Sequence, residues 1–456
     1  MKEKMSTNSI VKAAKDAGVQ LIRLEYCDAS GVARSKAVHI SQLETKMRDG
    51  VNLTRAQMAI NMLETMIHID GMEPIGEIRI VPDPDTFRVL PWVPGSAVVL
   101  CDQLDETRTD WGACPRSFLK KMIERAASLG LRFEAAFENE YYLAYEDDGK
   151  YRPFDFVHHS PVYSPIGHDL NAQIMIDTVS ALEKMGIEPE QAINEFGRGQ
   201  QEIAIHYTDA LRAADNQMYF RDTVRGVALQ HGLLASFAPK PFPDEIGSGA
   251  HIHFSLWDTK TNVNVLHDES SERGLSLIAR QFVAGVQAHL PALVALTAPS
   301  YNSYRRLKPG AWASSTASWG FDNKEVALRV ISPFFEGSGQ SLNIEYKPSD
   351  ASSNPYLSLG ALLAAGLDGI DRGLTPGLPC EHDPAKLSPE ELAACKAVPL
   401  PSTMHDALNN LEGDKFLTSS LGDLLTRCIL LTRRHEADQF AANDIDFEIN
   451  NHFYRF

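Results

Sequence analysis

Residues 131–145 read LRFEAAFENEYYLAY, a strand-length apolar run with two closely spaced acids at its centre. Side chains alternate between the two faces of a strand, so Glu138 and Glu140 share one face, and Phe137, Asn139 and Tyr141 share the other. Two carboxylates about 7 Å apart on such a strand require a cation, unless their face is a solvated edge. The strand alone leaves both interpretations open.

Helices and strands alternate on both sides of this segment. Pro115 near the start of CPRSFLKKMIERAASLG and Gly130 at its end predict a helix there. SSNPYL at 352–357 predicts another capped helix start, and we expect the last helix to end before DFEINNHFYRF at 446–456. This order favours an α+β fold, with helices packed outside a mixed sheet.

The first 105 residues form a unit of their own. A helix is expected at 8–17, a hairpin from VQLIRLEYC (19–27) and VARSKAVHI (32–40), and further strands at 75–92 and 95–105. We expect a boundary near Trp111, where the helix that starts at Pro115 opens the second region. We therefore expect two domains, 1–105 and 106–456.

Composition excludes several classes of partner. The 456 residues include 43 Lys and Arg against 60 Asp and Glu, a net charge of −17 that opposes binding to nucleic acid or anionic lipid. The six cysteines are widely spaced, without a CxxC pair, and the charged start lacks an apolar signal core. These features predict a soluble cytoplasmic protein with reduced thiols.

Two further segments carry metal-ligand chemistry. In NEFGRGQQEIAIH, Glu195 and Glu202 flank two glycines that permit a tight turn, so both acids could face one cavity. In AHIHFSL, His251 and His253 share one strand face. This spacing suits metal ligands, although single histidines are more often hydrogen-bonded core residues.

Basic residues concentrate near residues 305–347 of this acidic chain. Glu345 and Lys347 share a strand face, and five cations precede them: Arg305, Arg306, Lys308, Lys324 and Arg329. An anionic ligand is the functional interpretation, and a salt-bridged surface is the alternative.

Together these clusters indicate ATP-dependent chemistry. Carboxylates that hold divalent cations, with basic groups beside them, are what transfer of a γ-phosphoryl group requires. The chain has no GxxxxGK[ST] loop and no GxGxxG after a strand. A P-loop or Rossmann site therefore does not explain the pattern.

Five ordered motifs, FENEYYL, NEFGRGQQEI, GSGAHIHFSL, NSYRRLKPG and IEYKPSDASSNPYL, resemble the glutamine synthetase family over nearly the whole chain. The resemblance implies a β-grasp-like N-terminal domain over 1–105 and a catalytic domain over 106–456 with an antiparallel-rich bifunnel. It also implies a homo-oligomer, commonly a dodecamer of two stacked hexameric rings. Each active site would lie between one subunit's catalytic domain and its neighbour's N-terminal domain.

The resemblance implies two ions of Mg²⁺ or Mn²⁺ and a phosphorylated intermediate. ATP would convert glutamate to γ-glutamyl phosphate, and a nitrogen nucleophile would displace the phosphate. The implied metal ligands are Glu140, Glu195 and Glu202 for one ion, and Glu138, His251 and Glu345 for the other.

The same resemblance assigns the remaining polar residues. His253 and Lys324 would contact ATP phosphates, and Arg329 would stabilise the transferring phosphoryl group. Arg306 would bind the carboxylate of glutamate, beside Gly247 and Lys347. The glutamate pocket departs from the family pattern, because Ile246 replaces the usual Asn before Gly247 and Lys347 replaces an Arg.

The amine site departs further. Family members that use ammonia usually carry a Glu in PGxEAP, whereas this chain reads PGAWAS with Trp312 in that place. The DGSS motif is missing, and Thr54 in DGVNLTRAQ is its best match. Relatives that ligate glutamate to organic amines also show this Trp, and an indole can meet an amine by packing or cation–π contact.

We therefore expect a ligase that joins glutamate to a small organic amine. An ordinary glutamine synthetase that uses ammonia is the first alternative, with Trp312 as a packing residue. A non-catalytic relative is the second, and the presence of all six implied metal ligands disfavours it. The sequence leaves the amine open among alkyl, aryl, hydroxyalkyl and polyamine types.

Overall fold

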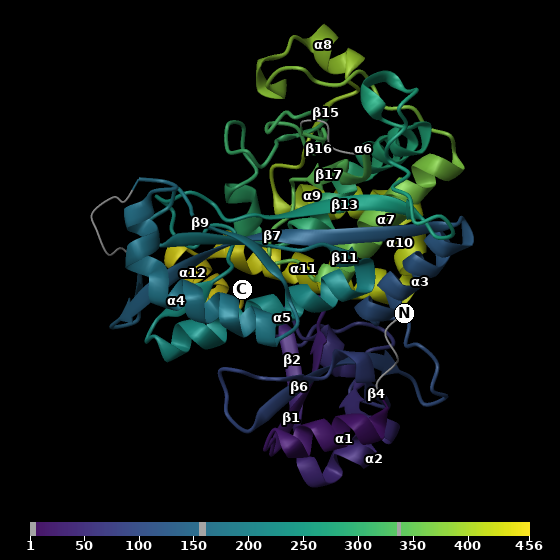
Figure 1. The fold of residues 1–456 in the computed structure, drawn as a ribbon. Coiled ribbons are helices and arrows are strands. Elements are labelled where there is room, and N and C mark those ends of the chain that lie inside the picture. Colours follow the sequence, from purple (N-terminus) through teal and green to yellow (C-terminus); the bar gives the residue numbers. More distant parts are fainter. Residues whose placement is uncertain (1–5, 155–160, 335–338) are drawn as a thin grey trace.

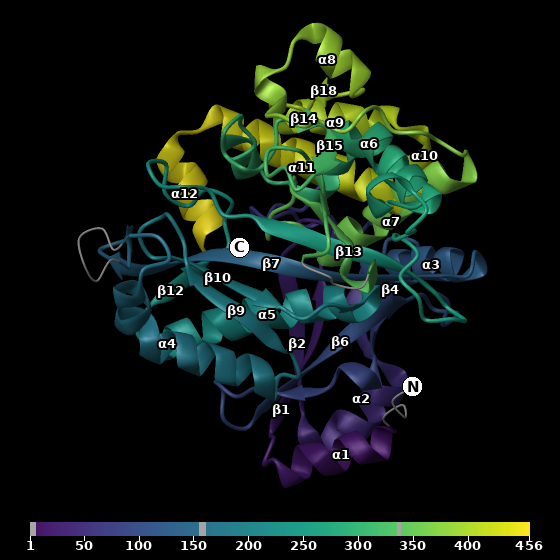
Figure 2. The ribbon, with the colours of Figure 1, turned by 45° about the horizontal axis from the view of Figure 1, so that its top comes forward.

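The computed structural model describes residues 6–154, 161–334 and 339–456. Most of its strands belong to two sheets, a six-stranded one near the N-terminus and a ten-stranded one in the rest of the chain (Figure 1). Figures 1 and 2 show helices α1 and α2 at one end of the molecule and α8 at the other. The mixed helix and strand content confirms the α+β prediction.

The N-terminal sheet has the strand order β2-β1-β6-β4-β3, with β5 added on β6. Strands β1 and β6 are parallel, and β1 and β2 form the predicted antiparallel hairpin, with Leu21 opposite His39. Helix α1 buries Ile10 and Ala14. The elements are α1 (Thr7–Asp16), β1 (Leu21–Cys27), β2 (Ala33–His39), α2 (Leu43–Asp49), β3 (Val51–Thr54), β4 (Glu77–Pro82), β5 (Arg88–Val89) and β6 (Ser96–Leu104).

The larger sheet has the order β15-β16-β17-β13-β7-β10-β9 and is antiparallel except between β15 and β16. Strands β8, β11 and β12 pair with the long strand β7. Its strands are β7 (Leu131–Asp147), β8 (Lys150–Pro153), β9 (Pro189–Asn194), β10 (Gln200–Ile205), β11 (Thr208–Asp209), β12 (Leu234–Ser236), β13 (Ala250–Asp258), β15 (Trp319–Phe321), β16 (Leu328–Ile331) and β17 (Asn343–Tyr346). A short sheet pairs β14 (Thr316–Ala317) with β18 (Val398–Pro399).

Helices cover one face of the larger sheet. Phe254 of β13 stacks on Phe133 of β7 and packs against Phe282 of α6, with ring centroids 5.3 Å apart in both pairs. The helices are α3 (Pro115–Ser128), α4 (Pro165–Lys184), α5 (Ala210–Gln230), α6 (Leu277–Thr297), α7 (Pro355–Asp371), α8 (Pro389–Ala394), α9 (Met404–Gly413), α10 (Lys415–Leu421), α11 (Asp423–Ala442) and α12 (Ile445–Phe453).

Amide side chains fix α5 under the centre of β7. Asn139 donates to Gln217 at 2.8 Å, and Gln217 donates back at 2.6 Å. Because Asn139 faces α5, its neighbours Glu138 and Glu140 face the opposite side of the sheet. The fold thus leaves one face of β7 for the acidic side chains.

Two helix starts follow the sequence closely, and one helix was missed. Pro115 opens α3, and Asn354 caps α7 just before Pro355. The prediction that residues 446–456 follow the last helix was wrong, because α12 covers most of them. Asp444 caps α12 by accepting from the backbone of Phe447, and the helix packs its buried residues into the catalytic domain.

One helix within the described residues, α6, is long and apolar enough to cross a membrane. Its apolar window is 67% buried in the protein, and Phe282 packs in the aromatic group described above. These features are those of a core helix. We propose the domain boundary at residue 105, since β6 ends at Leu104 and α3 begins at Pro115.

Candidate active site

Strand register brings the predicted polar residues together on the open face of the larger sheet. Residues directly opposite each other on neighbouring strands point to the same face. Four such pairs lie side by side: Glu202 opposite Glu140, His251 opposite Glu138, His253 opposite Glu345, and Arg329 opposite Glu345. Five neighbouring strands, β10, β7, β13, β17 and β16, therefore build one polar row.

Both histidines reach the acids of this row. Nδ1 of His251 lies 3.3 Å from carboxylate oxygens of Glu138 and Glu345. Nε2 of His253 lies 3.5 Å from Glu138, and its Nδ1 lies 3.1 Å from Oδ1 of Asn343. Glu138, His253 and Glu345 offer ligand atoms that all lie within 4.8 Å of one another. His253, which we expected at the ATP phosphates, thus also lies among the expected metal ligands.

The imidazoles supply positive charge to two of the acids. Burial opposes ionisation of Glu138, but hydrogen bonds with His251 and His253 hold its pKa below the usual value. Burial likewise opposes ionisation of Glu345, and His251 and Lys347 hold its pKa well below the usual value. Burial opposes protonation of His253, yet Glu138 and Glu345 raise its pKa to about 9.

The acids at the other end of the row crowd one another. Burial and the charges of Glu138 and Glu140 raise the pKa of Glu202 to about 10. Burial and Glu140 also raise the pKa of Glu195. A divalent cation would relieve this repulsion, and carboxylate oxygens with imidazole nitrogens are donors that suit Mg²⁺ or Mn²⁺. The residues present therefore fit the metal that the sequence predicts.

Two arginines bring positive charge to the same face. Arg329 donates from Nη1 to Glu345 at 3.1 Å, and its buried Nε has no hydrogen-bond partner in the described chain. Arg306 contacts Nε2 of His251 at 3.0 Å and donates to the carbonyl of Lys347 at 3.2 Å. Its buried Nη1 is also without a partner among the described residues. Each guanidinium thus keeps a donor suited to an anion.

Glycines make room for Arg306. A Cβ on Gly249 would lie 2.6 Å from Nη2 of Arg306 and 2.9 Å from Nε2 of His251. A Cβ on Gly247 would lie 2.9 Å from Cγ of Arg306. Gly247, which we predicted to bind substrate, is therefore required by the close approach of Arg306.

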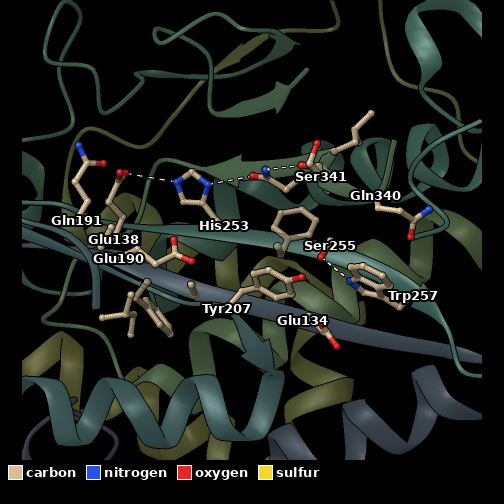
Figure 3. Close-up of a pocket in the computed structure, with 17 residues that line it drawn as sticks. Glu134, Glu138, Glu190, Gln191, Tyr207, His253, Ser255, Trp257, Gln340 and Ser341 are labelled. Atoms are coloured by element: carbon tan, nitrogen blue, oxygen red, sulfur yellow. Dashed lines mark hydrogen bonds and ion pairs between the residues drawn. The ribbon is translucent and has the colours of Figure 1, made fainter. Parts of the chain in front are cut away.

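A cavity of about 570 Å³ opens beside Glu138 and His253 (Figure 3). Tyr207 and Trp257 also line it, with nearly parallel rings whose centroids are 6.5 Å apart. Its size and mixed polar and aromatic lining suit a nucleotide.

An aromatic group lies near the acids, formed by Tyr163, Phe196 and Trp312, which we term the aromatic rim. The ring of Phe196 packs edge-on against Trp312 at 5.9 Å and against Tyr163 at 6.1 Å. Trp312 remains 44% exposed. Nζ of Lys324, expected at the ATP phosphates, lies 4.9 Å from the Trp312 ring centroid.

Two predicted residues lie outside this constellation. Thr54 ends β3 in the N-terminal sheet, and the N-terminal domain contacts the catalytic domain at α5 through Trp92 and at α11 through Met58, whose carbonyl accepts from Cys428. Within the described residues, no hydrogen bond or ion pair joins Thr54 to the polar row, and its buried hydroxyl has no partner. Arg305 pairs with Glu448 of α12 at 2.7 Å, which supports the salt-bridge interpretation for that residue.

Sequence reasoning missed several site residues. Gln200 donates to Glu140 at 3.1 Å and to the carbonyl of Gly247 at 3.1 Å, so it joins β10 to the glycine loop. Asn343 could have been found, because it stands two residues before Glu345 on the same strand face. Tyr163 lies in a loop where no periodic signal operates.

Comparison with known proteins gives matches over nearly the whole chain. A model of the glutamine synthetase N-terminal domain matches residues 5–113, and one of the glutamine synthetase catalytic domain matches residues 112–452. Glutamine synthetase of Halobacterium salinarum is 33% identical over 443 residues, 96% of this chain and 94% of that protein. Gamma-glutamylpolyamine synthetase GlnA3 of Streptomyces coelicolor is 33% identical over 432 residues, 94% of this chain and 92% of that protein.

Solved structures agree with these matches. A structure described as GmaS without ligand has a TM-score of 0.84 at 28% identity and covers 96% of this chain and 97% of its own. A novel glutamine synthase homolog has a TM-score of 0.84 at 30% identity and covers 96% of this chain and 99% of its own.

Proposed function

Because this chain belongs to the glutamine synthetase family of ATP-dependent carbon–nitrogen ligases, we propose that it joins the side-chain carboxylate of glutamate to an organic amine. The reaction would pass through γ-glutamyl phosphate and release ADP and phosphate. The amine attacks the activated carbonyl, and phosphate leaves as the carbon–nitrogen bond forms.

The polar row divides into roles under this proposal. Bound Mg²⁺ or Mn²⁺ would supply charge neutralisation to the phosphates of ATP. Ligands for one ion would be Glu140, Glu195 and Glu202, and Glu138, His251, His253 and Glu345 are available for the other. ATP would occupy the cavity between Tyr207 and Trp257.

The two arginines would act on different anions. Arg329 lies beside Glu345 and would stabilise negative charge on the transferring phosphoryl group. Arg306, held by His251 and the Gly247 to Gly249 loop, would bind the carboxylate of glutamate. Lys347 would support this pocket by pairing with Glu345 at 2.8 Å.

The aromatic rim is the observation that carries the choice of an organic amine. Lys324 places an alkylammonium group 4.9 Å from the Trp312 ring, so this ring face already accommodates the chemistry of an amine substrate. Trp312 adopts a φ of 50°, which is uncommon for a bulky residue and points to a functional constraint. Phe196 directly follows Glu195 in the chain, so the aromatic rim adjoins an expected metal ligand.

Ammonia is the second candidate nucleophile. The Halobacterium glutamine synthetase and the Streptomyces polyamine enzyme are each 33% identical to this chain. Overall identity therefore does not separate the two functions, and the proposal of an organic amine rests on the local chemistry of the aromatic rim.

An amine panel tests the proposal. Phosphate release from ATP is measured with glutamate, Mg²⁺ and ammonium, alkylamines, arylamines, ethanolamine or a polyamine. Burial of two or three methylenes against Trp312 is worth on the order of 2 kcal/mol, about thirtyfold in affinity. We expect kcat/KM for at least one organic amine to exceed that for ammonium about tenfold or more.

Two variants make the test specific to Trp312. Trp312→Phe keeps an aromatic face and should keep the ratio of kcat/KM for the organic amine to that for ammonium. Trp312→Glu should lower this ratio, because a carboxylate favours a compact cation. Ammonium as the best nucleophile across the panel would replace this proposal with ordinary glutamine synthetase activity.

We further propose a cytoplasmic homododecamer of two stacked hexameric rings. In the part of the chain that the structure describes, the buried hydroxyl of Thr54 has no partner and no hydrogen bond or ion pair joins it to the polar row, so a neighbouring subunit's N-terminal domain would complete the site. Thr54 would then meet the amine of that neighbour's site.

A further inference from the structure

A second cavity, of about 370 Å³, lies between the N-terminal sheet and α5. Arg23 of β1 and Trp92 line it from the N-terminal domain. Asp222, Arg225 and Gln230 line it from α5. The cavity is therefore built by both domains, and α5 separates it from the acids on the open face of β7.

Two guanidiniums in this cavity are without protein acceptors. Within the described ranges, neither Arg23 nor Arg225 donates a hydrogen bond or lies within 4 Å of a carboxylate oxygen. Nη2 of Arg225 is buried without a partner, and its guanidinium packs over Phe237 at 5.8 Å. Burial and the neighbouring Arg221 lower the pKa of Arg225 to about 10, against the opposing charge of Asp222.

The acids nearby do not cancel this charge. Asp222 is the acid among the lining residues, and burial and the charge of Asp222 raise the pKa of the buried carboxyl of Glu25 well above its usual value. Two guanidiniums against one charge leave the cavity positive.

Trp92 gives the cavity a fixed wall. A Cβ on Gly226 would lie 2.1 Å from the Trp92 ring, so only glycine permits this close contact with α5. Gln230 donates to the carbonyl of Trp92 at 3.0 Å. The ring of Trp92 thus packs on Gly226 while its backbone carbonyl is hydrogen-bonded to Gln230, and both contacts fix Trp92 against α5.

We propose that this interdomain cavity binds a small dianion, a phosphate monoester or a dicarboxylate, through Arg23 and Arg225. The ligand would bridge β1 to α5. Since Gln217 of α5 is hydrogen-bonded to Asn139, between Glu138 and Glu140, a ligand here would act on the helix that supports the active-site strand. The cavity would therefore be an effector site.

Isothermal titration calorimetry on the full chain tests this assignment. The probes are glycerol 3-phosphate for the phosphate monoesters, and succinate and 2-oxoglutarate for the dicarboxylates. We expect at least one probe to bind with a Kd of about 1 mM or tighter. Comparison of the two arms identifies which anionic group the cavity prefers.

Matched variants locate the binding. Arg23→Gln and Arg225→Gln should each weaken binding about tenfold or more, Arg225→Lys should weaken it less, and exposed Arg79→Gln should leave it unchanged. Arg306→Gln, in the active site, should also leave it unchanged. Hydrogen exchange of β1 and α5 should slow when the probe binds.

Three results would overturn the assignment. They are absence of binding by every probe at about 10 mM, equal binding by wild type and Arg23→Gln, or loss of binding in Arg306→Gln instead. If Arg225→Gln on α5 impairs folding, Arg23→Gln on β1 still tests whether binding depends on the cavity.

Discussion

Glu202 and Glu138 lie in the same polar row but meet opposite surroundings. Glu138 contacts two imidazoles, whereas burial and the charges of neighbouring carboxylates raise the pKa of Glu202 to about 10. A raised pKa in a folded acid means that stability falls as pH rises from the unfolded pKa towards the folded one. At pH 8 the buried Glu202 therefore lowers the stability of the metal-free folded protein.

We predict that Glu202→Gln stabilises the metal-free protein and weakens its metal binding. Melting in chelator at pH 8 should give a Tm about 2 °C or more above wild type, because the charge conflict is removed. The increase in Tm on adding Mg²⁺ should shrink in the variant. Glu134→Gln, on the neighbouring strand β7 and outside the polar row, serves as the control. A lower Tm for Glu202→Gln in chelator would contradict this account.

Arg329 is expected to act chiefly in the transition state. Its side chain pairs with Glu345 at 3.1 Å and keeps a buried donor without a partner in the described chain. We predict that Arg329→Ala lowers kcat about 100-fold while nucleotide binding changes little. Arg329→Lys should recover part of this loss. An unchanged kcat with a raised KM for ATP would make Arg329 a binding residue only.

At the scale of elements, His289 joins three helices. Its Nε2 lies 3.0 Å from Asp368 of α7, and its Nδ1 contacts Asp414, the N-cap of α10. Burial opposes protonation, but hydrogen bonds with Asp414 and Asp368 raise the pKa of His289. Both ring nitrogens donate only in the protonated form, so the imidazolium stabilises this junction.

We predict a pH-dependent contribution from His289. A raised folded pKa gives stability that is complete below the unfolded value of about 6.5 and is lost as pH rises through the folded value. His289→Gln should therefore cost about 1 kcal/mol or more at pH 6. Its melting profile should converge on that of wild type at high pH. Parallel profiles between pH 6 and 9 would contradict the assignment.

The sequence allowed elements with local signals to be predicted. Period-two alternation placed Glu138 and Glu140 on one face, and an Asn-Pro cap placed the start of α7. Pairing partners could not be derived in this way, because register depends on residues far apart in the chain. His253 and Glu345, for example, lie opposite each other on β13 and β17, although they are far apart in the sequence.

Loops were the least predictable part of the candidate site. Tyr163 has no periodic context, and Phe196 reads as part of a glycine turn. Helix α12 was missed because its polar sequence, rich in Asn and Asp, gives a weak apolar stripe. Its buried residue Glu448 accepts hydrogen bonds from Asn302 and Arg305, which only the folded chain brings near.

For the whole molecule, we predict that activity requires assembly. Among the described residues, no hydrogen bond or ion pair joins the N-terminal sheet to the acids of the polar row, so we expect a neighbouring subunit to supply that contact. Light scattering should give six or twelve chain masses, and activity per chain should fall on dilution into dissociating conditions. A fully active monomer would show that the site needs no neighbouring subunit.

The choice of nucleophile is tested most directly by competition in one reaction. The enzyme is given glutamate, ATP and Mg²⁺ with equal concentrations of ammonium and the best amine of the panel, and both products are counted by mass spectrometry. The product ratio equals the ratio of kcat/KM values. The aromatic rim predicts about ten or more molecules of γ-glutamylamide for each glutamine. An excess of glutamine would contradict the organic-amine proposal.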